Sequence, residues 1–233
     1  MRKVLVMLCL CLSLLAQASE PVSYMPWRYG VGSNIDDIEA TRTVFYRNQR
    51  EVYSDSGAGI YVGATKKGIM RKSNYWGGRG GFPTKGTPVP DKALLEMVSY
   101  HDHKRYRIEV DLPADLGRQM QQVYLVDGRH DRRDFLYFGL APGGYYEVLL
   151  QGGLLGVSPD ILLARGIASE VTDDWRDKRI PIARQYKNNL AVFDEKYGAL
   201  FKQYPIPLGM AWAPIMDAYR AAQPKTDEQP ITK

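Results

Sequence analysis

The segment Arg105–Leu112 constrains the fold most, because its polarity alternates without a break. Tyr106, Ile108, Val110 and Leu112 are uncharged and largely apolar, and each residue between them is charged. Successive side chains of a β-strand point to opposite faces of a sheet, so this pattern indicates a half-buried antiparallel strand. The chain is therefore expected to build a sheet with one face on a core.

Two β-hairpins are predicted from turn signals between apolar runs. The first joins a strand at Leu94–Tyr100 to Arg105–Leu112 through a charged turn at residues 101–104. The second joins Phe135–Leu140 to Tyr145–Gln151 through Ala-Pro-Gly-Gly, where Pro presets φ and Gly permits a positive φ. Further strands are predicted at Trp27–Val31, Ile38–Tyr46, Gly59–Val62 and Ile161–Glu170.

Helical patterns are confined to a few segments, mostly late in the chain. Pro113 suits the first turn of a short helix that runs to about Gln122. Apolar residues recur at helical spacing through Ile182–Gln203, and a last short helix is predicted at Pro214–Ala222. The sequence thus predicts an α+β fold that is mainly an antiparallel β-sheet or sandwich.

The first 18 residues are typical of a secretory signal peptide. Arg2 and Lys3 precede a short apolar run, and Ala-Gln-Ala follows it, so cleavage is expected before Ser19. The apolar run is too short to span a bilayer about 30 Å thick. Cys9 and Cys11 lie within it, too early for a lipid-anchored cysteine. We expect an exported, cysteine-free protein without a stable membrane anchor, made of one β-rich domain at 19–222 and a flexible tail at 223–233.

The charge balance disfavours a nucleic-acid partner. Removing residues 1–18 would remove two basic residues and no acidic one, which lowers the net charge from +5 to +3. Nucleic-acid-binding domains usually combine a pI above about 9 with clustered charge. The chain has 16 tyrosines, and tyrosine and arginine are enriched at protein interfaces, although both are also common on ordinary sheet surfaces.

No catalytic or metal-binding motif is complete. Ser158 lies in Gly-Val-Ser-Pro-Asp, which lacks the second glycine of a nucleophile elbow. His101 and His103 are spaced to share one face of a strand, but a zinc site needs three or four protein ligands. The glycines of 77–81 are not followed by the Gly-Lys-Ser/Thr of a phosphate-binding loop. We therefore expect no enzyme, no metal and no cofactor.

Two segments are predicted to be long loops, which are often either functional or disordered. The first, Lys66–Asp91, is rich in glycine and proline and contains Tyr75, Trp76 and Phe82. The second, Asp127–Asp134, is densely charged and reads either as a solvated hairpin end or as an electrostatic contact patch.

Four segments in this order resemble one bacterial family of exported proteins. They are Tyr-Met-Pro-Trp-Arg-Tyr-Gly at 24–30, Met-Val-Ser-Tyr at 97–100, Tyr-Arg-Ile-Glu-Val-Asp-Leu-Pro at 106–113 and Phe-Gly-Leu-Ala-Pro-Gly-Gly at 138–144. The family is known mainly as a domain of unknown function in Gram-negative envelopes, and many members are lipoproteins. Some members are encoded beside phospholipase effectors of type VI secretion systems and act as their immunity proteins.

The resemblance implies a periplasmic inhibitor whose partner is a cognate lipase or phospholipase effector, with the active site or the lid of the enzyme blocked. On this interpretation the two predicted loops supply the contacts. The expected partner-binding residues are Tyr75, Trp76, Arg79 and Phe82 in the first loop, and Arg129, Arg132 and Arg133 in the second. The alternative is a periplasmic binding or scaffolding protein for a small envelope ligand, either a sugar or a lipid.

Overall fold

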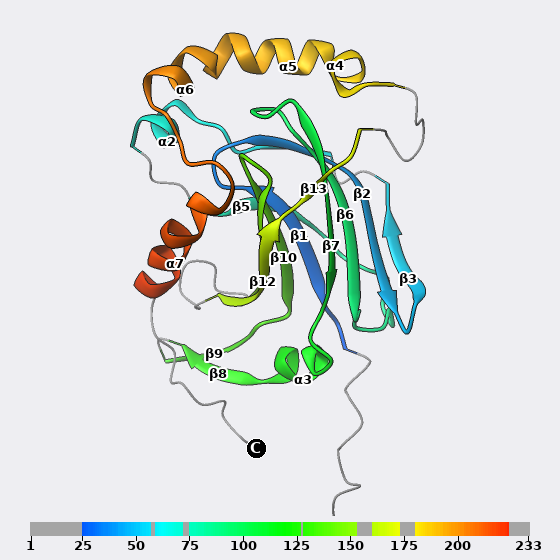
Figure 1. Ribbon diagram of the computed structural model, residues 1–233. Helices are drawn as coiled ribbons and strands as arrows, with labels where there is room; N and C mark the ends of the chain where they lie inside the picture. The colour runs from blue at the N-terminus through cyan, green and yellow to red at the C-terminus, as the bar shows by residue number, and fades with distance from the viewer. Residues whose placement is uncertain are drawn as a thin grey trace, which may run out of the picture.

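In a computed structural model of the chain, two β-sheets pack face to face and helices cover one end and one side (Figure 1). The structure describes residues 25–56, 59–71, 75–126, 128–152, 160–172 and 180–223. The predicted signal peptide and nearly all of the predicted tail lie outside these ranges. The mostly antiparallel, sandwich-like fold with late helices is the predicted one.

The first sheet has the strand order β12-β11-β10-β1-β5. Its strands are β1 (Arg28–Ser33), β5 (Gly77–Gly81), β10 (Phe135–Ala141), β11 (Tyr145–Gln151) and β12 (Ile161–Ile167). All neighbours are antiparallel except β1 and β10, which pair in parallel from Arg28 opposite Phe135 to Gly32 opposite Gly139. This places β5 at one edge of the sheet and β12 at the other.

The second sheet has the strand order β13-β7-β6-β2-β3, with β4 also paired to β2. Its strands are β2 (Asp37–Arg47), β3 (Arg50–Asp55), β4 (Gly59–Val62), β6 (Lys92–Ser99), β7 (Lys104–Asp111) and β13 (Ser169–Glu170). The predicted strand Ile161–Glu170 is divided at Ala168, where the chain leaves the first sheet and joins the second.

The hydrophobic core lies between the two sheets. Strand β7 confirms its predicted alternation from Tyr106 onward, since Tyr106 and Ile108 are buried in this core. Arg105, predicted on the charged outer face, is also buried, because Gln185 of the helical region packs on that face and accepts a hydrogen bond from its guanidinium group at 2.8 Å. The inner faces of the first sheet contribute Tyr29, Val31, Leu136, Phe138, Leu140, Val148 and Leu150. The second sheet contributes Ile38, Ala40, Phe45, Ala93, Leu95 and Met97. Full burial of a Val, Leu, Ile, Phe or Met side chain contributes about 1.5–3 kcal/mol relative to exposure, so this layer is a major source of the stability of the sandwich.

Both predicted hairpins are confirmed. Strands β10 and β11 are joined by a turn in which Gly143 and Gly144 have φ of +79° and +74°. These are left-handed conformations that glycine adopts without steric cost. A Cβ atom on Gly143 would also lie 2.2 Å from the backbone nitrogen of Gly209, so glycine is required there for a second reason.

The helices pack on the sandwich instead of interrupting it. Helices α4 (Ile182–Gln185), α5 (Lys187–Phe193) and α6 (Ala199–Gln203) form one array across an end of the sheets, with the π-helical turn η1 (Asp194–Gly198) between α5 and α6 (Figure 1). This array is the helical region predicted at Ile182–Gln203. Helix α7 (Ala213–Ala222), preceded by the 3-10 turn η2 (Gly209–Trp212), fulfils the last helical prediction. No helix in the described parts of the chain is long and apolar enough to cross a membrane.

Both predicted loops contain regular structure. Lys66–Asp91 includes helix α2 (Lys66–Arg71) and strand β5, and Asp127–Asp134 includes strand β9 (Arg129–Arg132), which pairs with β8 (Val123–Val126). The expectation of long loops is therefore wrong. The sequence does not predict strand β5, because Gly-Gly-Arg-Gly-Gly has no apolar alternation and glycine weakens a strand assignment. The short helix predicted after Pro113 is present as α3 (Leu116–Gln121).

Candidate functional site

Phe82 is the most exposed large hydrophobic side chain in the described residues. It directly follows β5, and 74% of its surface is accessible. Exposing an aromatic ring to this extent forgoes a large burial gain, because Phe is normally buried. Phe82 is one of the seven residues predicted to bind a partner, and its side chain is exposed as that role requires.

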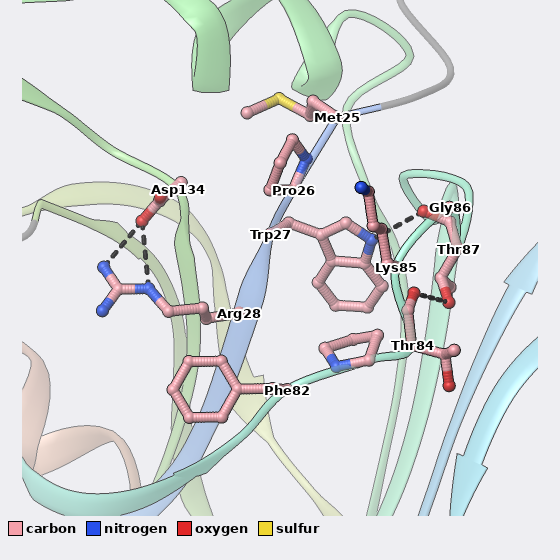
Figure 2. Close-up of a pocket in the computed structure, with 11 residues that line it drawn as sticks. Met25, Pro26, Trp27, Arg28, Phe82, Thr84, Lys85, Gly86, Thr87 and Asp134 are labelled. Carbon is pink, nitrogen blue, oxygen red and sulfur yellow. Dashed lines mark hydrogen bonds and ion pairs between the residues drawn. The ribbon is translucent and has the colours of Figure 1, made fainter.

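Phe82 borders an open pocket of about 630 Å³ at the end of the sandwich where β1 begins (Figure 2). The walls come from two segments, Met25–Arg28 and Phe82–Thr87, together with Asp134. Met25, Trp27 and Phe82 give the pocket a mainly apolar lining. The indole N–H of Trp27 donates to the carbonyl oxygen of Thr87 at 3.2 Å, which ties the two wall segments together.

An ion pair forms the polar side of the pocket. Arg28 donates from Nε and Nη2 to Oδ1 of Asp134, at 3.2 and 2.7 Å (Figure 2). The backbone joins the same two residues, since the N–H of Arg28 donates to the carbonyl oxygen of Asp134 at 2.9 Å. The guanidinium carbon of Arg28 also lies 5.3 Å from the centroid of the Phe135 ring. These contacts hold the guanidinium group in one orientation beside Phe82.

Trp76 is buried, with 9% of its surface accessible. Its indole N–H donates to Oε2 of Glu147 at 2.8 Å, and its ring stacks on Tyr145 with the centroids 6.4 Å apart. Glu147, on the outer face of β11, also accepts hydrogen bonds from Tyr145 at 2.6 Å and from Arg220 of α7 at 2.5 Å. The expectation that Trp76 stands on an exposed loop is wrong, because α7 covers this face of the sheet.

Arg220 completes the contact between α7 and the sheet. Burial acts to lower the pKa of its guanidinium group, but the hydrogen bond and charge of Glu147 outweigh burial, and the pKa is raised. Arg220 and Arg165 of β12 both pair with Asp217, the latter at 2.8 Å. Helix α7 is thus fixed by a buried charge pair with exposed ion pairs around it.

Tyr75 is half-buried beside the same helix. Its hydroxyl group donates to Asp160, which also accepts a hydrogen bond from Nε2 of Gln223 at 3.0 Å. Its ring lies 5.4 Å from that of Tyr219 on α7. Burial, followed by the charge of Asp160, raises the pKa of the Tyr75 hydroxyl group. Tyr75 therefore helps to fasten α7, and only part of its ring faces solvent.

The three predicted arginines of the second group divide between surface and interior. Arg129 and Arg132 are exposed on β9. Arg133 is buried, with its guanidinium carbon 4.0 Å from the centroid of the Tyr124 ring, and burial lowers the pKa of its guanidinium group. An exposed contact was the wrong expectation for Arg133, whose cation rests on an aromatic face. Arg79 lies in the middle of β5.

The structure thus divides the predicted binding residues by exposure. Trp76 and Arg133 are buried and Tyr75 is half-buried, whereas Phe82, Arg129 and Arg132 are exposed. Sequence reasoning identified Phe82 but missed the rest of the pocket. Arg28 and Asp134 are 106 positions apart, and nothing in the chain between them signals that β1 and β10 pair in parallel. The one local signal for this pocket is the pair Trp27-Arg28 at the start of β1, where an aromatic and a basic residue stand side by side.

A polar cluster lies where the β6–β7 turn meets the helical array. Asp36 is fully buried and accepts hydrogen bonds from Ser99 Oγ at 2.5 Å and from the N–H of His101 at 2.9 Å. His101 Nδ1 lies 2.8 Å from Oδ1 of Asp102, and its ring meets Phe201 of α6 edge-on at 4.7 Å. His103 pairs with Asp194 at 3.1 Å. Both histidines thus fasten the turn to the helices.

Within the described residues, no three His, Cys, Asp or Glu side chains converge as they would around a metal ion. The features at the Phe82 pocket are an exposed aromatic ring, an apolar hollow and an oriented ion pair. This combination can hold an apolar group and pair with polar groups beside it, which is the chemistry of a binding surface.

The chain forms a β-sandwich with an open, mainly apolar pocket at one end. Residues 15–209 match the family model described as "Protein of unknown function (DUF2931)", and the chain belongs to that family. The membership confirms the predicted relationship to a family of unknown function. No curated protein and no solved structure matches the chain.

Proposed function

We propose that the protein is a periplasmic immunity protein that binds a phospholipase effector of a type VI secretion system and blocks its active site or lid. The observation that carries the proposal is the exposure of Phe82, 74% accessible, at the rim of the apolar pocket. Membership of a family in which some exported members act as immunity proteins of such effectors supplies the biological setting. Export through the N-terminal signal peptide is part of the same proposal.

Inhibition by binding needs a rigid scaffold and a complementary surface. Stable protein complexes bury about 1,600 Å² in total, and a few aromatic or arginine anchors dominate the affinity. Phe82 and Arg28 are such groups, and they are adjacent on a firmly packed sandwich. Arg129 and Arg132, which are exposed on β9, are further candidate contacts with the partner.

The chemistry of the surface fits the proposed partner. A phospholipase must admit acyl chains, so the entrance to its active site is lined by apolar groups. Phe82 matches that lining, and the pocket beside it can take an apolar side chain from the enzyme. Trp76 and Arg133 are excluded as anchors of this interface, because both are buried among the protein's own side chains.

The proposal is tested in cells that export the phospholipase encoded by the neighbouring gene. Co-production of the protein with its signal sequence should preserve growth and membrane integrity. Production without residues 2–18 should give no protection, because enzyme and inhibitor would then occupy different compartments. Lysis to the same extent with and without the exported protein contradicts the proposal.

The pocket also supports a second function, the binding of a small envelope ligand. Its volume of about 630 Å³ lies within the range of small-molecule sites, roughly 300–1,000 Å³. The apolar walls favour a lipid chain over a sugar. Fluorescent fatty acid that binds stoichiometrically and is displaced by lysophospholipid would favour this function. The absence of binding would leave the protein partner as the occupant.

A further inference from the structure

Strand β5 is an edge strand whose main chain is open to solvent. It pairs with β1 on one side and ends the strand order of its sheet. Gly78 and Gly80 are both exposed. Because glycine has no side chain, the exposed surface at these two positions is the backbone itself. In an antiparallel edge strand, alternate residues direct their N–H and C=O groups away from the sheet, where another strand can pair with them.

The faces of β5 are covered, so the edge is the open approach. A Cβ atom on Gly77 would lie 2.0 Å from the hydroxyl oxygen of Tyr61 in β4. On the other face, a Cβ atom on Gly78 would lie 2.8 Å from the ring of Tyr137. Aromatic rings of neighbouring strands therefore occupy the space that side chains of β5 would need. The glycines allow this packing and leave a flat, narrow edge.

The segment of the chain that contains this edge strand is strongly basic. Between Ser56 and Pro90 the chain has six basic residues and no Asp or Glu. Lys66 and Lys67 on α2, and Lys85 after β5, are exposed. None of these three lysines forms an ion pair with a carboxylate of the described residues. A segment that approaches this edge therefore gains from negative charge.

Apolar side chains accompany the basic ones. Four of the eight exposed large hydrophobic side chains of the described residues fall within β4, α2 and the residue after β5: Ile60, Val62, Met70 and Phe82. Ile60 and Val62 are two apart on β4 and so share one face of that strand. Phe82, the residue directly after β5, is the one of these four that adjoins the edge strand in the chain, and an exposed aromatic side chain there is typical of an interaction surface.

We propose that β5 binds an extended, acidic segment of a protein partner by strand addition. The segment pairs its backbone with the open edge at Gly78 and Gly80, and its carboxylates face the surrounding lysines. Main-chain hydrogen bonds supply affinity in this mode, and side-chain pockets supply specificity. The inference rests on the proposed function in taking the partner to be a protein, and it adds the mode of binding and the chemistry of the bound segment.

Charge and backbone chemistry select this occupant over two others. A second copy of the chain would bring two basic stretches together, and like charges on neighbouring strands are destabilising. An anionic membrane would suit the lysines and the apolar side chains. However, its hydrocarbon offers no partner for the exposed backbone groups, and backbone groups left unpaired there are strongly unfavourable.

The test uses amide hydrogen exchange of the full exported chain with a synthetic peptide that alternates valine and glutamate. At millimolar peptide, exchange at Gly78 and Gly80 should slow by about tenfold, because paired edge amides become protected. The exposed glycine Gly128, in the β8–β9 turn, should not change. A peptide with lysine in place of glutamate should protect neither position. Equal protection by both peptides, or none by the acidic one, overturns the inference.

Matched charge variants locate the effect. Lys66→Glu, at the first residue of α2, should weaken binding of the acidic peptide several-fold, and Lys187→Glu, at the first residue of α5, should leave it unchanged. Equal effects of the two variants would overturn the placement of the peptide. Protection of Gly78 and Gly80 by anionic phospholipid vesicles, or by self-association alone, would assign the edge to those occupants instead.

A complex with the phospholipase separates this inference from the proposed function. If the complex forms and Gly78 and Gly80 exchange as in the free protein, strand addition is overturned while the proposed function stands. If no complex forms, the proposed function fails, and the peptide assay still decides whether the edge binds acidic strands.

Discussion

The indole nitrogen of Trp76 lies 2.8 Å from Oε2 of Glu147, and this hydrogen bond joins the segment before β5 to the middle of β11. The same carboxylate binds Tyr145 and Arg220, so one buried side chain of β11 connects this strand to the segment before β5 and to helix α7. This arrangement makes Trp76 an interior residue and leaves Phe82, six positions later, as the exposed aromatic side chain.

Truncation of these two aromatic side chains should therefore have opposite consequences. Trp76→Ala removes a buried ring and one of three donors to Glu147, and should lower the free energy of unfolding by about 3–5 kcal/mol. Phe82→Ala removes an exposed ring and should change it by no more than about 0.5 kcal/mol. Urea unfolding followed by tryptophan fluorescence or circular dichroism measures both values. Equal losses for the two variants would contradict the assignment of Trp76 to the interior.

Removal of one partner from the buried ion pair of Arg220 and Glu147 should strongly lower the free energy of unfolding. Arg220→Met leaves the Glu147 charge without its cation and should destabilise the protein by about 3–5 kcal/mol. Adding Glu147→Gln to this variant should recover part of the loss, because the unpaired charge is then removed. Arg132→Met on exposed β9 serves as the control, with little change expected. Thermal unfolding of the four proteins decides whether recovery occurs.

Two glycines with positive φ should respond differently to alanine. Gly143, with φ of +79°, has the backbone nitrogen of Gly209 2.2 Å from where a Cβ atom would lie. Gly128, with φ of +72°, has no atom within 4 Å of that position among the described residues. Gly128→Ala should cost about 1 kcal/mol of conformational strain. Gly143→Ala should cost about 1–3 kcal/mol more than Gly128→Ala, because the added Cβ atom would overlap the backbone of Gly209. Similar losses in urea unfolding would show that the β10–β11 turn tolerates a shift of η2.

Stability should decrease as pH rises through the neutral range. Burial raises the pKa of Asp36 to about 7 from 3.8, against the opposing hydrogen bonds from Ser99 and His101. The native state then keeps a proton that the unfolded chain has lost, so the free energy of unfolding falls between about pH 4 and pH 7.

His101 acts in the same direction, and Asp102 acts at lower pH. Burial acts to lower the pKa of His101, but the hydrogen bond to Asp102 and the charges of Asp36, Asp102 and Asp194 together raise it, so its contribution is also lost as pH rises. The pKa of Asp102 is lowered despite burial, chiefly by His101, and its contribution is lost in acid, below its ordinary pKa. Asp36→Asn should flatten the decline between pH 5 and 7.5, and Glu51→Gln on exposed β3 should not. Identical slopes in wild type and Asp36→Asn would refute the account.

The sequence predicted the sandwich because its central strands alternate. The alternation of Arg105–Leu112 identified the first hairpin. The Pro-Gly-Gly turn at residues 142–144 identified the second, whose strands β10 and β11 are buried on both faces. The helical spacing within 182–203 was equally informative. Gly198, which weakened that pattern, ends the π-helical turn of residues 194–198, an irregularity that spacing does not register.

The candidate site was only partly predictable. Phe82 was identified from composition, but the burial of Trp76 and Arg133 depends on tertiary contacts with α7 and Tyr124 that no local pattern indicates. Strand β5 was not predicted because it is made almost entirely of glycine. Glycine is needed there because the aromatic rings of Tyr61 and Tyr137 occupy the space that side chains of β5 would take. Trp76 and Phe82, six positions apart in the same glycine-rich segment, thus lie in the interior and on the surface respectively.

Affinity for the phospholipase should depend on Phe82. Phe82→Ala should weaken binding by at least tenfold, about 1.4 kcal/mol, because a central aromatic anchor is lost. Val192→Ala, which truncates another exposed apolar side chain on α5, should have no effect. Calorimetric titration of the three proteins measures the difference. Full affinity in Phe82→Ala would place the interface on another surface of the protein.

Titration of the phospholipase from the neighbouring gene with the Ser19–Lys233 protein, following heat and enzyme activity together, tests the central claim most directly. The account predicts a one-to-one complex of nanomolar affinity, with activity lost in proportion to the enzyme bound. An active, folded phospholipase that neither binds nor loses activity at micromolar protein would contradict it.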